Sequence, residues 1–239
     1  RIKQLKEITE EAQEKISKST VIVIGAGGVG SSCLEYLAGN GIGHIVICDF
    51  DDVSLTNLHR QVIHSESDLI NKADSAIKRL KSLNSTIKYT AYKAKLVDEN
   101  IKSLLTYQPN VIIDASDNPE TRFLVANLAF KYKIPHVFAS GVRFSFNLSS
   151  FNVIPNQPCF HCVFSKIPPI QLRQTALSDG VMGPAIGMAG CAAALEAIKI
   201  LIFPDQLEQK CLCGKLLWYN GLEWDQRIMK IAKKTNCVC

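Results

Sequence analysis

VIVIGAGGVGS, residues 21–31, is the stretch that decides the fold of this chain. Its β-branched apolar residues predict a buried strand, and the helical pattern from residue 30 predicts a helix directly after the turn. The turn carries Gly25, Gly27 and Gly30 in the G-x-G-x-x-G spacing, with Gly28 as an additional glycine. Glycine lets the backbone turn sharply and lets a phosphate approach main-chain N–H groups at the positive end of a helix. The stretch therefore predicts a nucleotide-binding turn.

Strand and helix patterns alternate around this turn. Expected strands cover residues 20–25, 44–49, 87–93, 110–114 and 135–140, and expected helices cover residues 4–18, 30–39, 67–83, 99–105 and 120–131. This alternation predicts an α/β fold: a Rossmann-like, mostly parallel sheet with helices on both faces.

The alternation of strand and helix patterns ends after residue 141. Residues 143–154 are typical of one or two longer antiparallel strands, residues 165–183 are irregular, and residues 184–202 predict a helix. Residues 215–219, the dipeptide Asn220-Gly221 and the residues from 222 onward predict a hairpin. We therefore expect a single domain over residues 1–239 that ends in an antiparallel extension.

Composition narrows the function classes. The net charge is +5 without a long Lys/Arg cluster, which argues against nucleic-acid binding. The N-terminal residues have mixed charge and no apolar signal core, and the most apolar window, residues 181–203, contains Pro184, Glu196 and Lys199. That window favours a buried helix over a membrane span. Nine cysteines, an odd number, indicate a reducing compartment, so we expect a cytoplasmic protein.

An acidic loop follows the second expected strand. Asp49 ends that strand and is placed to accept both hydroxyls of a ribose, although a cap at the strand end is the alternative. To this point NAD or FAD would fit. Residues 49–61, DFDDVSLTNLHRQ, then concentrate acids beside the expected ribose and end on Arg60 and Gln61. Arg60 and Lys72 together suit a triphosphate better than a dinucleotide.

A second acidic position follows the fourth expected strand. Asp117 lies in DASDN, residues 114–118, at the carboxyl edge of the sheet. A carboxylate there suits Mg²⁺, which prefers oxygen ligands and substrate phosphates. The alternative is a helix cap ahead of Pro119, and the sequence leaves both open.

The cysteines predict a zinc knuckle. Cys159 and Cys162 form a C-x-x-C pair that resembles half of a four-cysteine zinc site. Its second half is either Cys237 with Cys239 or Cys211 with Cys213, both C-x-C pairs. We expect His161 to be a bystander, and reduced free thiols or a redox pair are the alternatives.

Several motifs together point to a family. They are GAGGVG (residues 25–30), DFDDVSLTNLHRQ (49–61), Lys72, DASDNPETR (114–122), CFHC (159–162) and GVMGPAIG (180–187). In this order, over nearly the whole chain, the sequence resembles the ThiF/MoeB/HesA-type adenylyltransferases, which activate ubiquitin-like proteins and include the adenylation half of ubiquitin-activating enzymes.

The resemblance implies adenylation, by ATP with Mg²⁺, of the C-terminal carboxylate of a small Gly-Gly-ended sulfur-carrier protein or peptide. Arg60, Lys72 and Asp117 would be the catalytic residues, with Mg²⁺ on Asp117. The residues expected to bind ATP are Gly25, Gly27, Gly28, Gly30, Asp49, Asp51, Asn57, Arg60, Gln61, Lys72, Asp117 and Asn118. Residues 1–141 would form the nucleotide-binding half, and residues 142–239 the zinc and partner-binding half.

The resemblance carries further expectations. It favours Cys237 and Cys239 as the second zinc pair, and a homodimer in which Lys3 or Arg1 reaches the partner's site. Sulfur-transfer members carry a cysteine where this chain has Ala176, so we expect no covalent cysteine step. An NAD(P)-dependent oxidoreductase, indicated by the glycine turn, and a catalytically weak regulatory homologue are the alternative functions.

Overall fold

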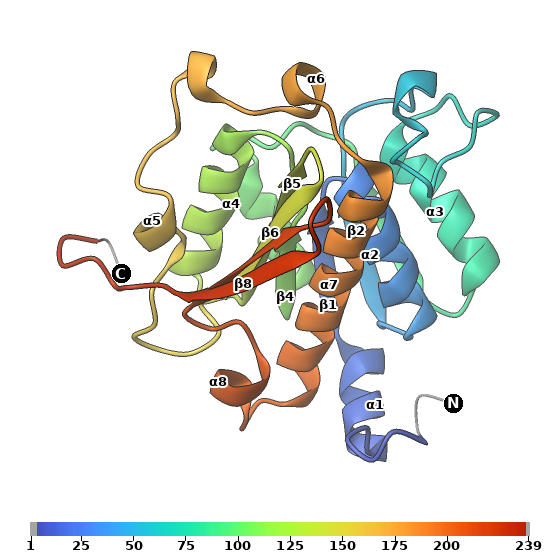
Figure 1. Ribbon diagram of the computed structural model, residues 1–239. Coiled ribbons are helices and arrows are strands. Elements are labelled where there is room, and N and C mark those ends of the chain that lie inside the picture. Colours follow the sequence, from blue (N-terminus) through green and yellow to red (C-terminus); the bar gives the residue numbers. More distant parts are fainter. Residues whose placement is uncertain (1–3, 238–239) are drawn as a thin grey trace.

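One eight-stranded sheet forms the centre of the computed structural model, which describes residues 4–237 (Figure 1). The strands lie in the order β3-β2-β1-β4-β5-β6-β7-β8. Five parallel strands come first in the chain: β1 (Thr20–Ile24), β2 (His44–Cys48), β3 (Lys88–Tyr92), β4 (Val111–Asp114) and β5 (His136–Val142). Three antiparallel strands follow: β6 (Ser145–Phe151), β7 (Lys215–Asn220) and β8 (Asp225–Lys230). The predicted α/β sheet with an antiparallel extension is confirmed.

Helices cover both faces of this sheet, because alternate residues of each strand point to opposite sides. Val21 and Val23 of β1 join one core cluster, while Ile22 and Ile24 join another. The first cluster packs against α1 (Glu10–Lys18), α2 (Gly28–Gly39), α3 (Lys72–Leu83) and α7 (Gly183–Ile202). The second packs against α4 (Pro119–Lys131) and the 3-10 helix η3 (Ile101–Tyr107). Shorter helical pieces are η2 (Leu55–Asn57), α5 (Phe160–Val163), η4 (Ile170–Leu172), α6 (Ala176–Asp179) and α8 (Leu207–Lys210).

Two helices begin later than predicted, each at a capping side chain. α1 begins at Glu10 rather than residue 4, because the Thr9 hydroxyl accepts a hydrogen bond from the Ala12 N–H at 3.1 Å. α3 begins at Lys72 rather than residue 67. There the Asn71 side chain caps the helix and donates to the Asp51 carbonyl at 3.0 Å. The expected helix over residues 99–105 is the 3-10 helix η3.

The C-terminal hairpin has a longer loop than predicted. Asn220 of β7 pairs with Asp225 of β8, so residues 221–224 form the loop and the second strand does not begin at residue 222. The Asn-Gly pair does not make the tight turn, because the Gly221 N–H donates instead to the Phe144 carbonyl at 2.8 Å. Trp224 takes the left-handed conformation at the end of the loop.

Helix α7 is long and apolar enough to cross a membrane, but it lies inside the protein fold. It runs beside α2, with its inner face against the sheet (Figure 1). A Cβ at Gly190 would lie 2.1 Å from both the Ser32 Oγ and the Val29 carbonyl oxygen, so the two helices approach closely at this glycine. Most of the apolar window is buried, as the sequence predicts for a core helix.

Candidate functional site

The glycine turn joins β1 to α2 at the carboxyl edge of the parallel strands. Gly25 has a φ of 97°, and a Cβ on Gly30 would lie 2.0 Å from the Gly25 carbonyl oxygen, so both positions require glycine. α2 begins at Gly28, two residues before the predicted start, and its N-cap, Gly27, offers no side-chain hydrogen bond. The first N–H groups of the helix are therefore available to an anion in the adjoining cavity.

Asp49 lies beside this turn, directly after β2, and lines the same cavity. One carboxylate oxygen accepts a hydrogen bond from the Ala26 N–H at 2.8 Å, and the other accepts from the Asp51 N–H at 3.0 Å. Burial raises the pKa of Asp49, while the positive charge of Lys72 and the two backbone donors oppose this shift. Asp49 therefore stabilises the glycine turn as well as lining the cavity.

Two predicted phosphate-binding cations are held by neighbouring side chains. The Lys72 ammonium, nearly fully buried at the start of α3, lies 2.9 Å from an Asp51 carboxylate oxygen. The Arg60 guanidinium donates to the Asn57 amide oxygen at 2.6 Å. Asp51 and Asn57 thus orient the cations that face the cavity.

Asp117 is exposed at the mouth of the cavity, on the loop after β4. The cap ahead of Pro119 is Asn118, whose side-chain oxygen accepts from the Thr121 N–H at 2.8 Å. The alternative interpretation of Asp117 as the helix cap is therefore wrong. Its carboxylate remains available to a cation that accompanies bound phosphates.

Arg122 is a cavity residue to which the sequence analysis gave no role. Its Nη2 and Nε donate to the Ser116 carbonyl oxygen at 2.8 and 3.2 Å, and its Cζ lies 5.4 Å from the centre of the Phe138 ring. Burial lowers the pKa of Arg122, and the charges of Asp114 and Asp117 oppose that shift. The available signal was its place in the first turn of α4, four residues after the cap, where a side chain reaches back toward the helix N-terminus.

One cavity collects most of the predicted nucleotide-binding residues. Those that line it are Gly25, Gly27, Gly28, Asp49, Asp51, Arg60, Gln61, Lys72, Asp117 and Asn118. Gly30 and Asn57 do not line the cavity. Gly30 packs against the Gly25 carbonyl, and the Asn57 side chain accepts a hydrogen bond from Arg60. Gln61 is buried, and its side-chain oxygen has no hydrogen-bond partner among residues 4–237.

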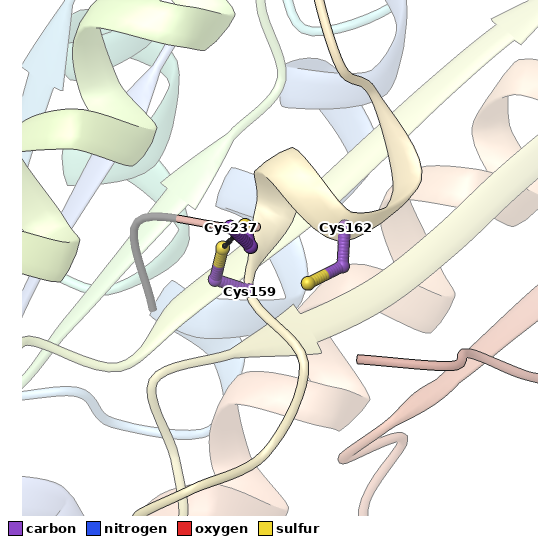
Figure 2. A group of neighbouring side chains, drawn as sticks. All are labelled: Cys159, Cys162 and Cys237. Atoms are coloured by element: carbon purple, nitrogen blue, oxygen red, sulfur yellow. Dashed lines mark hydrogen bonds between the residues drawn. The ribbon is translucent and has the colours of Figure 1, made fainter. Parts of the chain in front are cut away.

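A cluster of three cysteines lies away from this cavity. The Sγ atoms of Cys159, Cys162 and Cys237 all lie within 4.8 Å of one another (Figure 2). Cys159 caps the short helix α5, which carries Cys162, and Cys237 comes from the C-terminal segment. Three converging thiols suit a tetrahedral zinc ion. Their fourth expected ligand, Cys239, lies outside the described residues, as do Arg1 and Lys3.

The competing cysteine pair lies elsewhere. Cys211 and Cys213 are buried beside Glu196, whose carboxylate accepts from the Leu212 N–H and from the Ser150 hydroxyl. The cluster therefore contains Cys237 rather than this pair. His161 does not join it either, because its Nε2 lies 2.7 Å from the Asn127 side-chain oxygen.

Comparison with known sequences identifies the family. The profile of the ThiF family matches residues 1–239. The chain belongs to the ThiF family. Curated relatives include "Adenylyltransferase and sulfurtransferase MOCS3" of Culex quinquefasciatus, 38% identical over 98% of this chain and 52% of the relative. "Adenylyltransferase and sulfurtransferase UBA4" of Yarrowia lipolytica is 39% identical over 95% of this chain and 57% of the relative. The chain thus spans about half the length of these relatives.

Solved structures show the same fold. The crystal structure of E. coli MccB aligns with a TM-score of 0.80 and 22% identity, over 95% of this chain and 66% of that one. A crystal structure of E. coli MccB with ATP aligns with a TM-score of 0.78 and 21% identity, over 95% of this chain and 68% of that one. These likenesses support the ThiF-type fold.

Proposed function

We propose that this ThiF-family chain adenylates the C-terminal carboxylate of a ubiquitin-like protein or peptide, releasing pyrophosphate from ATP. The observation that carries the proposal is the cavity at the N-terminus of α2, which gathers the acid that follows β2, three cations and an exposed carboxylate. The curated relatives named adenylyltransferases support the same reaction class.

The proposed chemistry rests on positioning and charge. Asp49 would accept the ribose hydroxyls, and the N–H groups that begin α2 would bind phosphate oxygens. The incoming carboxylate is already ionised and needs no base. Arg60, Lys72 and Arg122 would stabilise charge that develops on the α-phosphate and on the leaving pyrophosphate. Mg²⁺ held by Asp117 would neutralise further phosphate charge.

Part of the cavity lining suits a narrow acyl tail. It includes Gly141, Ala176 and Val181. A Cβ on Gly141 would lie 2.4 Å from the Ile186 Cδ1, so this wall admits no larger residue without repacking. Small apolar walls favour a tail without side chains, which supports a partner that ends in Gly-Gly.

We further propose that the reaction stops at the acyl-adenylate. Ala176 lines the cavity where sulfur-transfer members carry a cysteine. Cys48 also lines the cavity, but burial raises its pKa, so it stays a neutral thiol and a poor nucleophile. The sulfurtransferase activity in the relatives' names would then require residues outside this cavity.

ATP–pyrophosphate exchange tests the proposal. Purified chain with Mg²⁺ should exchange labelled pyrophosphate into ATP only when a Gly-Gly-ended small protein from the same organism is present. Removing the two terminal glycines of that partner should abolish exchange. ATP binding without exchange for every such partner would instead favour a regulatory homologue, and reduction of NAD⁺ by a small substrate would favour an oxidoreductase.

Assembly and metal content complete the proposal. Residues 142–239 would hold zinc, on Cys159, Cys162, Cys237 and Cys239, and would contact the partner protein in the cytoplasm. A homodimer would bring Lys3 or Arg1 of one subunit to the cavity of the other. Light scattering should then give twice the chain mass, and K3A or R1A should lower exchange only where that residue supplies the cation.

A further inference from the structure

We infer that His64 is a positioning residue for ATP, which clamps the Ala26 peptide of the glycine turn to helix α3. Through that clamp it sets the orientation of the N–H groups that begin α2. The inference deepens the proposed function and rests on it only in taking ATP as the ligand of the cavity.

The imidazole of His64 is buried, with a hydrogen bond at each nitrogen. Its Nε2 lies 2.8 Å from the Ala26 carbonyl oxygen, and its Nδ1 lies 2.9 Å from the Ser75 hydroxyl. A carbonyl only accepts, so Nε2 carries the proton. Burial lowers the pKa of His64, so the ring is neutral at neutral pH and Nδ1 accepts the Ser75 hydroxyl hydrogen. The two partners thus select one tautomer and one ring orientation.

The Ala26 peptide is held on both sides. Its N–H donates to the Asp49 carboxylate at 2.8 Å, and its carbonyl accepts from His64. Ala26 lies between Gly25 and Gly27, whose backbones rotate more freely than those of other residues. Fixing the one non-glycine residue of this short stretch fixes the direction of the N–H groups that follow it.

The other end of the clamp lies on the helix that carries Lys72. Ser75 and Lys72 are three residues apart on α3, so their side chains lie on neighbouring positions of one helix face. Lys72 in turn contacts Asp51, whose N–H donates to Asp49. His64 therefore connects the glycine turn to α3, the helix whose first residue contacts Asp51.

A packing role alone does not account for this arrangement. His136 is more deeply buried than His64, yet neither of its ring nitrogens has a hydrogen-bond partner within residues 4–237. His64 instead makes two bonds of good length to parts of the nucleotide site that are distant from each other in sequence. The directional bonds, rather than the burial, distinguish it.

Equilibrium titration of the full chain with ATP tests the clamp without requiring turnover. In H64Q the longer glutamine side chain places its amide N–H where Nε2 was, so it still donates to the Ala26 carbonyl. In H64N the shorter asparagine side chain places its amide only where Nδ1 was, so it can bond to the Ser75 hydroxyl but not to the Ala26 carbonyl. We expect H64N to raise the Kd for ATP about tenfold, as for a buried carbonyl left unpaired, and H64Q to stay within about threefold of wild type by the same reasoning. H44Q is the matched control, because the His44 Nε2 bonds to the Thr90 hydroxyl at 2.9 Å from the opposite end of β2.

Thermal unfolding without nucleotide separates positioning from stability. Weaker ATP binding by H64N than by H64Q, with H44Q equal to wild type, supports the clamp. Equal Kd values for H64N and wild type, or equal weakening in H64N and H64Q that follows their melting temperatures, overturn it. Should H64N fail to fold, S75A provides the test: a Kd raised about threefold supports the clamp, and an unchanged Kd contradicts it. Wild-type chain that binds no ATP refutes the proposed function instead.

Discussion

The nucleotide cavity and the cysteine cluster are built differently. The cavity is lined from several strand ends and helix starts, and its charged side chains are held by protein partners such as Asp51 for Lys72 and Asn57 for Arg60. The cluster joins thiols from two places 78 residues apart, Cys159 and Cys237, next to a helix of four residues. The charged side chains of the cavity are thus held by the protein itself, whereas the cluster is suited to be stabilised by a central ion. The nucleotide cavity should therefore govern the chemistry, and the cysteine cluster should govern the stability of the fold.

The largest expected effect is the loss of Asp117. D117A should lower the rate of ATP–pyrophosphate exchange by about 10²-fold or more, the size found when one preorganised charge-stabilising group is removed. Because Asp117 is exposed and Asn118 supplies the helix cap, the melting temperature should stay unchanged. N118A is the contrasting variant and should lower stability by about 1 kcal/mol through loss of the cap. A D117A protein with wild-type exchange would contradict the assignment.

Loss of a cysteine from the cluster should lower stability and leave ATP binding unchanged, the reverse of the result expected for Asp117. C159S should lose bound zinc and about 2 kcal/mol of stability, or roughly 5 °C in melting temperature, while the Kd for ATP stays near the wild-type value. Metal analysis and calorimetry measure both quantities. C211S should keep its zinc, because Cys211 lies in the separate pair beside Glu196. Zinc retained in C159S, or lost in C211S, would reverse the assignment of the cluster.

Sequence analysis predicted the parts of the site that depend on local pattern. Asp49 ends a strand in an apolar-to-acidic run, and the glycine spacing places the turn beside it, so both positions followed from residue order. Arg122 was missed because its place four residues after the cap indicates that its side chain reaches back along α4, but does not show that this end of the helix borders the cavity. Its guanidinium reaches the cavity only because α4 begins at the carboxyl edge of β4.

Boundaries failed where contacts with residues distant in the sequence intervened. Residues 67–71 are not helical despite their helix pattern, because Asn71 forms a β-bridge with Asp52 and its side chain donates to the Asp51 carbonyl. The Asn-Gly hairpin is overridden because Gly221 bonds to Phe144 of the neighbouring connection. The meeting of Cys237 with Cys159 depends on the path of the C-terminal segment, and spacing alone left Cys211 and Cys213 equally available as thiols.

A smaller effect should come from the residue that orients Arg60. N57A removes the amide oxygen that accepts from Nη2 at 2.6 Å, but leaves the guanidinium in place. We expect the KM for ATP in the exchange assay to rise about fivefold, corresponding to about 1 kcal/mol for one charged hydrogen bond. R60A should raise it further. Equal KM values for N57A and wild type would show that Asn57 does not position this cation.

The last prediction is a pH dependence of stability that arises from His64. Burial lowers the pKa of the folded residue, so as the pH falls below the unfolded value of about 6.5 the unfolded chain takes up the proton first. The neutral His64 therefore contributes its full stability to the fold above that pH. The free energy of unfolding decreases below that pH, by at most about 1.4 kcal/mol per pH unit. H64Q has no such proton to bind. Urea unfolding at pH 7.5 and 5.5 should show wild type losing stability relative to H64Q, and a difference that is constant with pH would contradict the buried, neutral imidazole.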